Sequence, residues 1–162
     1  MPGVGKTTIG KLLSKNLNIK HIDIDRSIEI NESQEINDLI AEKGEEAFRI
    51  LEKKALSFAI HSKELAIVST GGGVILDQEN NYLIKNQAYV VHIKSSVEEI
   101  SNRINVDSRP LLYNTNKLKA LCSLWQQREK LYNDVAKITI DIKGLSIDMA
   151  AQKIYSRLSS VS

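Results

Sequence analysis

The chain has 162 residues, a net charge of +2, and 42% hydrophobic and 26% charged residues, which is the balance of a soluble globular protein. This length predicts one domain over residues 1–162, with room for a hydrophobic core. The small net charge argues against a dedicated nucleic-acid surface, and no apolar run reaches membrane-spanning length. The single cysteine, Cys122, excludes an internal disulfide and a four-cysteine metal site, and it suits a reducing compartment.

The first predicted element is a glycine-rich loop that leads into a helix. It matches the phosphate-binding motif G-x-x-x-x-G-K-[ST] over Gly3-Val4-Gly5-Lys6-Thr7-Thr8. Glycines let successive N–H groups curl around phosphate oxygens, the lysine carries charge to the β- and γ-phosphates, and Thr7 is placed to ligate Mg²⁺. An apolar stripe predicts the helix, through Ile9, Leu12, Leu13 and Leu17. The alternative is a chance run of these residues at a frayed terminus.

The first glycine of the motif would precede Met1, and so would the strand that normally feeds such a loop. In folds of this kind that strand lies in the middle of a parallel sheet, buried on both faces. We therefore expect Met1 to be an internal methionine of a chain that starts upstream, and the complete sheet to have a fifth strand. An organellar transit peptide could be missing with the upstream residues.

Strand-like and helix-like stretches alternate along the rest of the chain, which predicts an α/β fold with a parallel sheet. Strands are expected at residues 21–24, 65–69, 89–93 and 138–142. Helices are expected at residues 26–30, 35–42, 45–59, 77–86, 96–103, 117–134 and 146–158. Gly44 is expected to end one helix, and Ser96-Val97-Glu98-Glu99 is expected to form a capping box that starts another.

Two aspartates, Asp23 and Asp25, lie where the first of these strands ends. Ligands bind at this carboxyl edge in open α/β sheets. At a spacing of i, i+2 on a strand the two carboxylates would share one side, and Mg²⁺, a lysine or substrate hydroxyls would have to offset their repulsion. The alternative is that the strand end is acidic only because it is wet.

Three consecutive glycines, Gly71-Gly72-Gly73, follow the apolar strand at residues 65–69. Bare backbone amides allow a ligand to approach closely, which suits an anion. The alternative is a flexible turn. Three glycines cost conformational entropy that a simple turn does not require, so a functional role is favoured.

Several arginines are candidates for anion binding. Arg49 and Glu52 share a helix face at i, i+3, although such a pair alone is usually a solvated surface pair. Arg128 shares its helix face with two aromatic residues and could merely pack its stem over them. Arg109, in the stiffened run Arg109-Pro110-Leu111-Leu112, fits a lid that carries an arginine to a transferring phosphoryl group, although loop arginines are usually solvated. Three dispersed histidines are expected to be structural or exposed: His21, His61 and His92.

Taken in order, these motifs resemble the shikimate kinase family, which belongs to the nucleoside-monophosphate-kinase-like branch of phosphate-loop proteins. The motifs are the G-K-T loop, D-x-D at 23–25, F-R-x-x-E at 48–52, T-G-G-G at 70–73, R-P-L-L at 109–112 and R-x-x-L-Y at 128–132. The resemblance covers essentially the whole chain. It implies a three-layer α/β/α fold with five parallel strands, the first absent from this chain, substrate-binding helices at about residues 26–60 and a lid at about residues 105–116.

The resemblance also implies an activity, the ATP-dependent phosphorylation of the 3-hydroxyl of shikimate to shikimate 3-phosphate in the chorismate and aromatic amino-acid pathway, with Mg²⁺ as cofactor. The implied catalytic residues are Lys6, Asp25 and Arg109, and the implied metal site is Thr7 with Asp23 acting through water. The implied nucleotide-binding residues are Gly3, Val4, Gly5, Lys6, Thr7, Thr8, Arg103, Arg109 and Pro110. The implied substrate-binding residues are Asp25, Arg49, Gly71, Gly72, Gly73 and Arg128, with Glu52 orienting Arg49.

Partners implied in this way are shikimate and ATP, with no nucleic acid and no membrane, for a monomer in the bacterial cytoplasm or, with a transit peptide, in a plastid. One alternative is another small-molecule kinase of the same branch, such as a gluconate-type kinase, which would not need the T-G-G-G segment and the paired arginines. Another is a non-catalytic relative kept as a binding module. Such a relative would be expected to lose its lysine, aspartate or lid arginine first, and all of these remain here.

Overall fold

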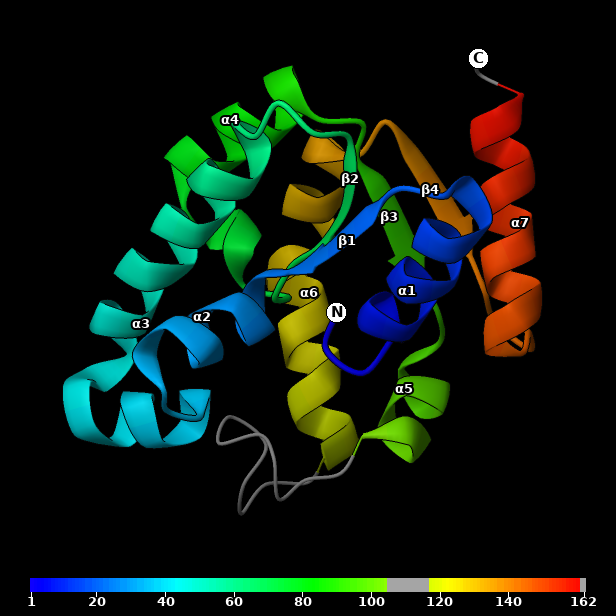
Figure 1. The fold of residues 1–162 in the computed structure, drawn as a ribbon. Coiled ribbons are helices and arrows are strands. Elements are labelled where there is room, and N and C mark those ends of the chain that lie inside the picture. The colour runs from blue at the N-terminus through cyan, green and yellow to red at the C-terminus, as the bar shows by residue number, and fades with distance from the viewer. Residues whose placement is uncertain (105–116, 161–162) are drawn as a thin grey trace.

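The computed structural model describes residues 1–104 and 117–160, in which strands and helices alternate (Figure 1). The strands are β1 (Lys20–Asp23), β2 (Ala66–Ser69), β3 (Val91–Lys94) and β4 (Ile138–Asp141). The helices are α1 (Lys6–Leu17), α2 (Ile24–Glu32), α3 (Ile36–Ile60), α4 (Gln78–Gln87), α5 (Val97–Arg103), α6 (Lys117–Val135) and α7 (Ile147–Ser159), with a short 3₁₀ turn, η1 (Val74–Leu76). All four expected strands are present within one or two residues of their predicted bounds.

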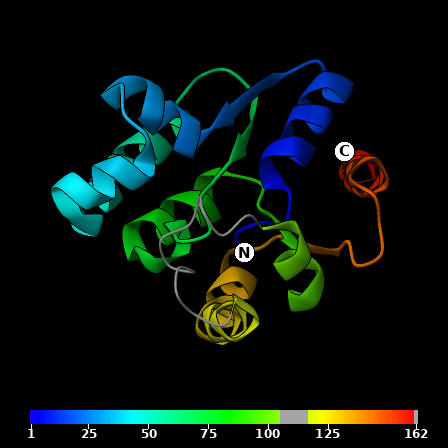
Figure 2. The ribbon, with the colours of Figure 1, turned by 90° about the horizontal axis from the view of Figure 1, so that it is seen from below.

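The strands form two parallel pairs. β1 pairs with β2, with Lys20 opposite Ala66, and β3 pairs with β4, with Val91 opposite Ile138. Helices α2, α3 and α4 lie on one side of the strands and α1 and α7 on the other (Figures 1 and 2). Parallel pairs joined through helices confirm the predicted α/β class, because only a crossover connection can bring successive strands into parallel order.

Apolar side chains from the strands and helices form two buried clusters. The larger one joins α1, α6 and α7 to β4 through Ile9, Leu121, Ile140, Ile142 and Ile154. The smaller one lies under α2 and α3 and contains Ile24, Ile28, Leu39, Phe48 and Ala59. The smaller cluster fixes α3 against the start of α2, and it thereby holds the helices that carry Asp25 and Arg49.

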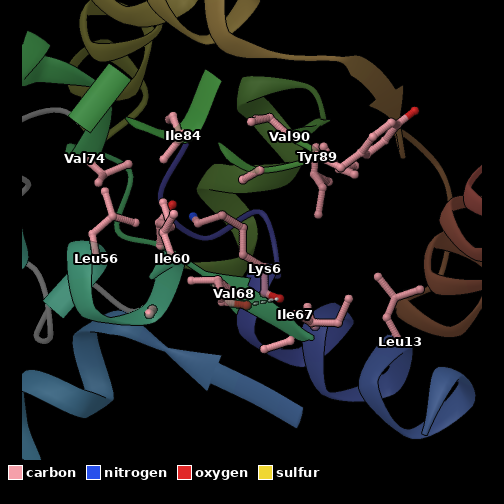
Figure 3. Close-up of a pocket in the computed structure, with 18 of the residues that line it drawn as sticks. Lys6, Leu13, Leu56, Ile60, Ile67, Val68, Val74, Ile84, Tyr89 and Val90 are labelled. Carbon is pink, nitrogen blue, oxygen red and sulfur yellow. Dashed lines mark hydrogen bonds between the residues drawn. The ribbon is translucent and has the colours of Figure 1, made fainter. Parts of the chain in front are cut away.

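A cavity of about 860 Å³ lies between the two strand pairs. Mostly apolar side chains line it, among them Leu13, Leu56, Ile60, Ile67, Val68, Val74, Ile84 and Val90, and Lys6 also borders it (Figure 3). In the described residues no ladder joins β2 to β3, so the expected fifth strand is not seen among them. Protein interiors are normally close-packed, and side chains that border a void lose the dispersion contacts it would otherwise provide.

One detail of the helices differs from the expectation, and another is confirmed. Asp25 lies in the first turn of α2, not on the strand, because Asp23 both ends β1 and caps α2 by accepting a hydrogen bond from the Arg26 N–H (3.1 Å). Gly44 has the non-helical values φ 85° and ψ 163° and separates two helical stretches of α3, so the helix break expected at Gly44 is confirmed. In the described part of the chain, no helix combines the length and the apolar character that crossing a membrane requires.

Candidate active site

The glycine-rich loop immediately precedes α1, as the motif predicts. Gly3 and Gly5 have positive φ values of 71° and 96°, in the left-handed region that favours glycine. A side chain at Gly3 would collide with Ile104, and one at Gly5 would place its Cβ 2.9 Å from Ile147 Cδ1. The loop is therefore closely enclosed by the residue that follows α5 and by the first residue of α7.

Lys6 begins α1 and is held at both its side chain and its main chain. Its Nζ donates to the Met1 carbonyl (2.7 Å), and its own carbonyl accepts a hydrogen bond from Ser69 Oγ (3.1 Å). Ser69 is buried at the end of β2, and its hydroxyl lies 2.9 Å from His21 Nε2 on β1. Burial lowers the pKa of His21, although Asp23 opposes that shift. Ser69 and His21 thus fix the first turn of α1 to both strands of the pair.

The Thr7 hydroxyl donates to Asp23 Oδ2 at 2.6 Å, so the two predicted metal-site residues are in contact. The cap on α2 fixes the other oxygen of Asp23, since Oδ1 accepts from the Arg26 N–H. A hydroxyl and a carboxylate are oxygen donors of the kind Mg²⁺ prefers, and protein sites for Mg²⁺ often supply only one or two ligands and leave the rest to water and phosphate. The residues present therefore fit this cation.

Arg49 and Glu52 on α3 form an ion pair of which one member is almost fully buried. Arg49 Nη1 lies 2.7 Å from Glu52 Oε2, and Nη2 lies 2.8 Å from Glu45 Oε1. Glu52 is only 1% exposed, and burial raises its pKa while Arg49 opposes the shift. Burial also works against the charge on Arg49, but its two carboxylate partners outweigh burial and raise its pKa. The alternative of a solvated surface pair is therefore wrong for this pair.

The glycine run packs directly against these charged groups. A Cβ at Gly71 would lie 2.7 Å from Glu52 Oε1 and 3.0 Å from Asp25 Oδ1. At Gly73 it would lie 2.7 Å from Arg49 Nη1. The glycines are needed here for space, because any larger residue would displace the carboxylates and the guanidinium.

Arg128 reaches the same run from α6. Its Nη1 donates to the Gly72 carbonyl at 3.1 Å, and the Tyr132 hydroxyl donates to the same oxygen at 2.6 Å. Arg128 is 7% exposed. Its guanidinium therefore has a specific polar contact, and packing over the aromatic rings alone does not describe it. A half-buried arginine on α3 and a buried one on α6 therefore both contact the glycine run.

Sequence reasoning missed three residues that support the site: Ser69, His21 and Tyr132. Their hydrogen-bond partners lie 48 to 63 residues away along the chain, so no local sequence pattern predicts these contacts. Tyr132 also stacks on His92 of β3, with ring centroids 5.0 Å apart. A buried hydroxyl at the end of an apolar strand was the one available signal for Ser69.

The structure thus brings most of the predicted residues to one edge, at the carboxyl ends of β1 and β2. The loop, the pair Thr7 and Asp23, and the group formed by Asp25, Arg49, Gly71–Gly73 and Arg128 are neighbours there. Arg103 is the last residue of α5 and precedes Ile104, which packs on the loop at Gly3. Helix α5 lies on the opposite side of the loop from α2 and α3 (Figures 1 and 2). Arg109, Pro110 and the expected lid at 105–116 fall outside the described residues.

Known proteins resemble this chain over nearly its whole length. A family model described as shikimate kinase matches residues 2–159. A shikimate kinase from Francisella tularensis subsp. holarctica is 35% identical over 157 residues, which cover 96% of this chain and 89% of that protein. One from Dictyoglomus turgidum is 35% identical over 160 residues, which cover 96% and 92%.

Solved structures give the same result. The structure of shikimate kinase from Acinetobacter baumannii in complex with shikimate matches with a TM-score of 0.93 at 32% identity, covering 99% of this chain and 89% of that one. The structure of shikimate kinase from Bacteroides thetaiotaomicron matches with a TM-score of 0.86 at 25% identity, covering 98% and 94%. Sequence and fold therefore point to the same relatives.

Proposed function

Because this chain belongs to the shikimate kinase family of phosphotransferases, we propose that it transfers the γ-phosphoryl group of ATP to the 3-hydroxyl of shikimate with the residues gathered at the carboxyl ends of β1 and β2. The observation that carries this assignment is the pair of arginines, the half-buried Arg49 and the buried Arg128, that contact the run Gly71–Gly73. Two guanidinium groups and bare amides suit a small planar carboxylate. The solved relative from Acinetobacter baumannii, whose structure contains shikimate, supports this choice of acceptor.

The glycine-rich loop at residues 3–8 is proposed to bind the nucleotide. The backbone N–H groups of residues 3–8 and the N-terminus of α1 face the phosphates, and Lys6 adds a point charge. Thr7 and Asp23 would hold Mg²⁺, which when bound neutralises charge on the phosphates. Two further residues, Arg109 and Pro110, are proposed to contact the nucleotide, with Arg109 also stabilising the charge that develops on the transferred group.

Asp25 is proposed to accept a hydrogen bond from the acceptor hydroxyl and so orient it for attack, or to take its proton. Its position supports this role, because Asp25 Oδ1 lies beside Gly71, where Glu52 Oε1 also packs, and Asp25 follows Asp23 by two residues in the first turn of α2. Glu52 keeps Arg49 in place through the 2.7 Å contact. Phosphoryl transfer requires positioning and charge neutralisation more than covalent chemistry, and this arrangement supplies both.

We further propose that the chain is a single-domain monomer that works in the cytoplasm. The one cysteine, Cys122, is an exposed free thiol, which suits a reducing compartment. Helices α2 and α3 share one hydrophobic cluster, which holds them together. This packing supports the expectation that residues 26–60 bind the substrate as one unit.

The test is ADP release by the purified chain with Mg·ATP, in the presence and absence of shikimate. We expect strong stimulation by shikimate and none by gluconate, since gluconate is the acceptor of the alternative class of kinase. Stimulation by gluconate alone would move the assignment to that class. Nucleotide binding without stimulation by either acid would favour a non-catalytic relative.

A further inference from the structure

Glu99 on α5 does not behave as the capping-box pattern predicts. Ser96 Oγ does accept a hydrogen bond from the Glu99 N–H (3.3 Å), which starts the helix. The Glu99 carboxylate turns elsewhere. Its Oε2 accepts from the buried Ser95 hydroxyl (2.6 Å), and its Oε1 accepts from the Gly144 N–H (2.8 Å). One side chain therefore joins α5 to a segment 45 residues further along the chain.

That segment is the tight turn between β4 and α7. The Leu145 N–H donates to the Ile142 carbonyl (3.0 Å), and Gly144 has φ 73°, which a glycine adopts without strain. Ser146 then caps α7 through a hydrogen bond from the Met149 N–H (3.2 Å). The bond to Glu99 satisfies an N–H at the tip of this turn, so it fixes the turn relative to α5.

Arg103, one helical turn after Glu99, belongs to the same group. Its Nη2 lies 3.7 Å from Glu99 Oε2. The Ser95 hydroxyl and the Gly144 N–H lower the pKa of Glu99, and Arg103 and Lys143 add to the effect, so the carboxylate is charged at neutral pH. Glu99 thus contacts both the Arg103 guanidinium on α5 and the Gly144 N–H of the 142–146 turn, and so fixes their spacing.

Helix α5 and the 142–146 turn flank the phosphate-binding loop on the side away from the proposed shikimate-binding residues. Ile104, directly after α5, packs on Gly3, and Ile147 at the start of α7 packs on Gly5. On the other side of the loop, Asp23 contacts Thr7, and Gly72 lies beside Pro2. A Cβ added at Gly72 would lie 3.3 Å from the Pro2 nitrogen. A nucleotide whose γ-phosphate faces Asp25 therefore directs its base towards α5 and the 142–146 turn.

We propose that Glu99 is a positioning residue for the nucleotide base, which it serves by holding Arg103 and the 142–146 turn as the two walls of the base site. This inference rests on the proposed function of the loop as the nucleotide-phosphate site. It assigns to Glu99 no contact with the reacting atoms. Substitution of Glu99 should therefore weaken nucleotide binding and leave shikimate binding unchanged.

The test compares Glu99→Ala with Glu98→Ala, a matched control at an exposed position on the same turn of α5. For Glu99→Ala we expect the Kd for ADP and the KM for ATP to rise about tenfold, which corresponds to about 1.4 kcal/mol. The KM for shikimate and kcat should stay within about twofold, because the proposed shikimate-binding residues do not touch Glu99. Glu98→Ala should leave all four quantities unchanged.

Inorganic tripolyphosphate separates a base site from general damage to the loop, because it offers phosphates without a base. Its Kd should be the same in the unchanged chain and in Glu99→Ala. An equal loss of ADP and tripolyphosphate affinity, or identical behaviour of the two alanine variants, would overturn the proposal. If Glu99→Ala does not fold, Ser95→Ala removes one of the two hydrogen bonds, and it should raise the Kd for ADP about threefold with tripolyphosphate unchanged.

Failure of this inference is distinguishable from failure of the proposed function. ADP binding is measured without any acceptor, so it reports on Glu99 even if shikimate is not phosphorylated. Conversely, shikimate-dependent ADP release by the unchanged chain tests the reaction whatever Glu99 does.

Discussion

The acceptor side of the site and the centre of the strand layer are built in opposite ways. Charged side chains pack so closely on Gly71 and Gly73 that a Cβ could not be added at either position without moving Glu52 or Arg49. Between β2 and β3, apolar side chains surround a cavity of about 860 Å³. The hydrogen bonds of the acceptor side lie within α3, from Arg49 to Glu52, and between α6 and the glycine run, from Arg128 to Gly72, so they do not depend on a ladder between the two strand pairs.

This difference separates activity from stability. Substitutions on the acceptor side should change kinetics and leave unfolding nearly unchanged, whereas substitutions in the apolar core should do the reverse. Within the core, residues that border the cavity should matter less than residues packed on all sides, because they have fewer neighbours to lose.

The largest effect is expected for Asp25→Asn. The amide keeps the shape but loses the charge and the ability to take a proton, so we expect kcat to fall about a thousandfold. The Kd for ADP should stay within about twofold, because Asp25 lies on the acceptor side. Steady-state kinetics and equilibrium titration measure the two quantities. The control is Asp38→Asn at an exposed position of α3, and an equal loss of nucleotide binding in Asp25→Asn would contradict the role.

A pair of core substitutions tests the other half of the comparison. Leu121 and Leu56 are both at most 1% exposed, but only Leu56 borders the cavity. Leu121→Ala should lower the free energy of unfolding by about 4 kcal/mol and Leu56→Ala by about 2 kcal/mol, the upper and lower parts of the usual range. Urea unfolding measures both. Equal losses would mean that the cavity does not reduce the packing of Leu56.

Arg49→Lys should have a smaller, purely kinetic effect. Lysine keeps the charge but cannot present two parallel N–H groups to a carboxylate. We expect the KM for shikimate to rise about thirtyfold, with the KM for ATP unchanged, from the loss of a charge-assisted hydrogen bond. Arg26→Lys, at an exposed position of α2, is the matched control. An unchanged KM for shikimate would remove Arg49 from the carboxylate clamp.

Much of this organisation could be predicted from the sequence, because it is encoded in local patterns. The loop glycines, the order of strands and helices, and the need for bare backbone at Gly71–Gly73 all follow from short motifs or from periodicity. The environment of Asp25 was not predictable in the same way, because two residues after a strand end are too few to show either a strand or a helix period. Asp23 is both the last residue of β1 and the N-cap of α2, so Asp25 lies in the first turn of the helix.

Tertiary partners account for the rest of what the sequence did not show. Ser69 and Tyr132 act on carbonyls that lie more than 50 residues away, at Lys6 and Gly72. The local rule for Glu99 was half right, since Ser96 caps the helix while the carboxylate bonds to a distant turn. A local motif thus identified the helix start but not the partner that uses the side chain.

The smallest predicted effect concerns His92, which borders the cavity and is 7% exposed. Burial, followed by the charges of Lys94 and Lys6, lowers its pKa from 6.5 to about 4. Because the folded-state pKa lies below the unfolded one, the fold favours the neutral ring, and stability is lost as the pH falls from 6.5 towards 4. Between pH 7.5 and pH 5 this loss should be on the order of 1–2 kcal/mol.

His92→Phe keeps an aromatic ring against Tyr132 and removes the titrating group, so it should abolish that part of the pH dependence. Urea unfolding of both proteins at several pH values measures the difference, with His61→Phe at an exposed position as the control. The kcat of His92→Phe should stay close to that of the unchanged chain, since His92 reaches the acceptor side through Tyr132, whose hydroxyl donates to the Gly72 carbonyl, and phenylalanine keeps the stacking on Tyr132. An unchanged pH profile of unfolding would show that His92 is protonated in the folded state as readily as in water. A large loss of kcat would instead show that the two regions are coupled through Tyr132.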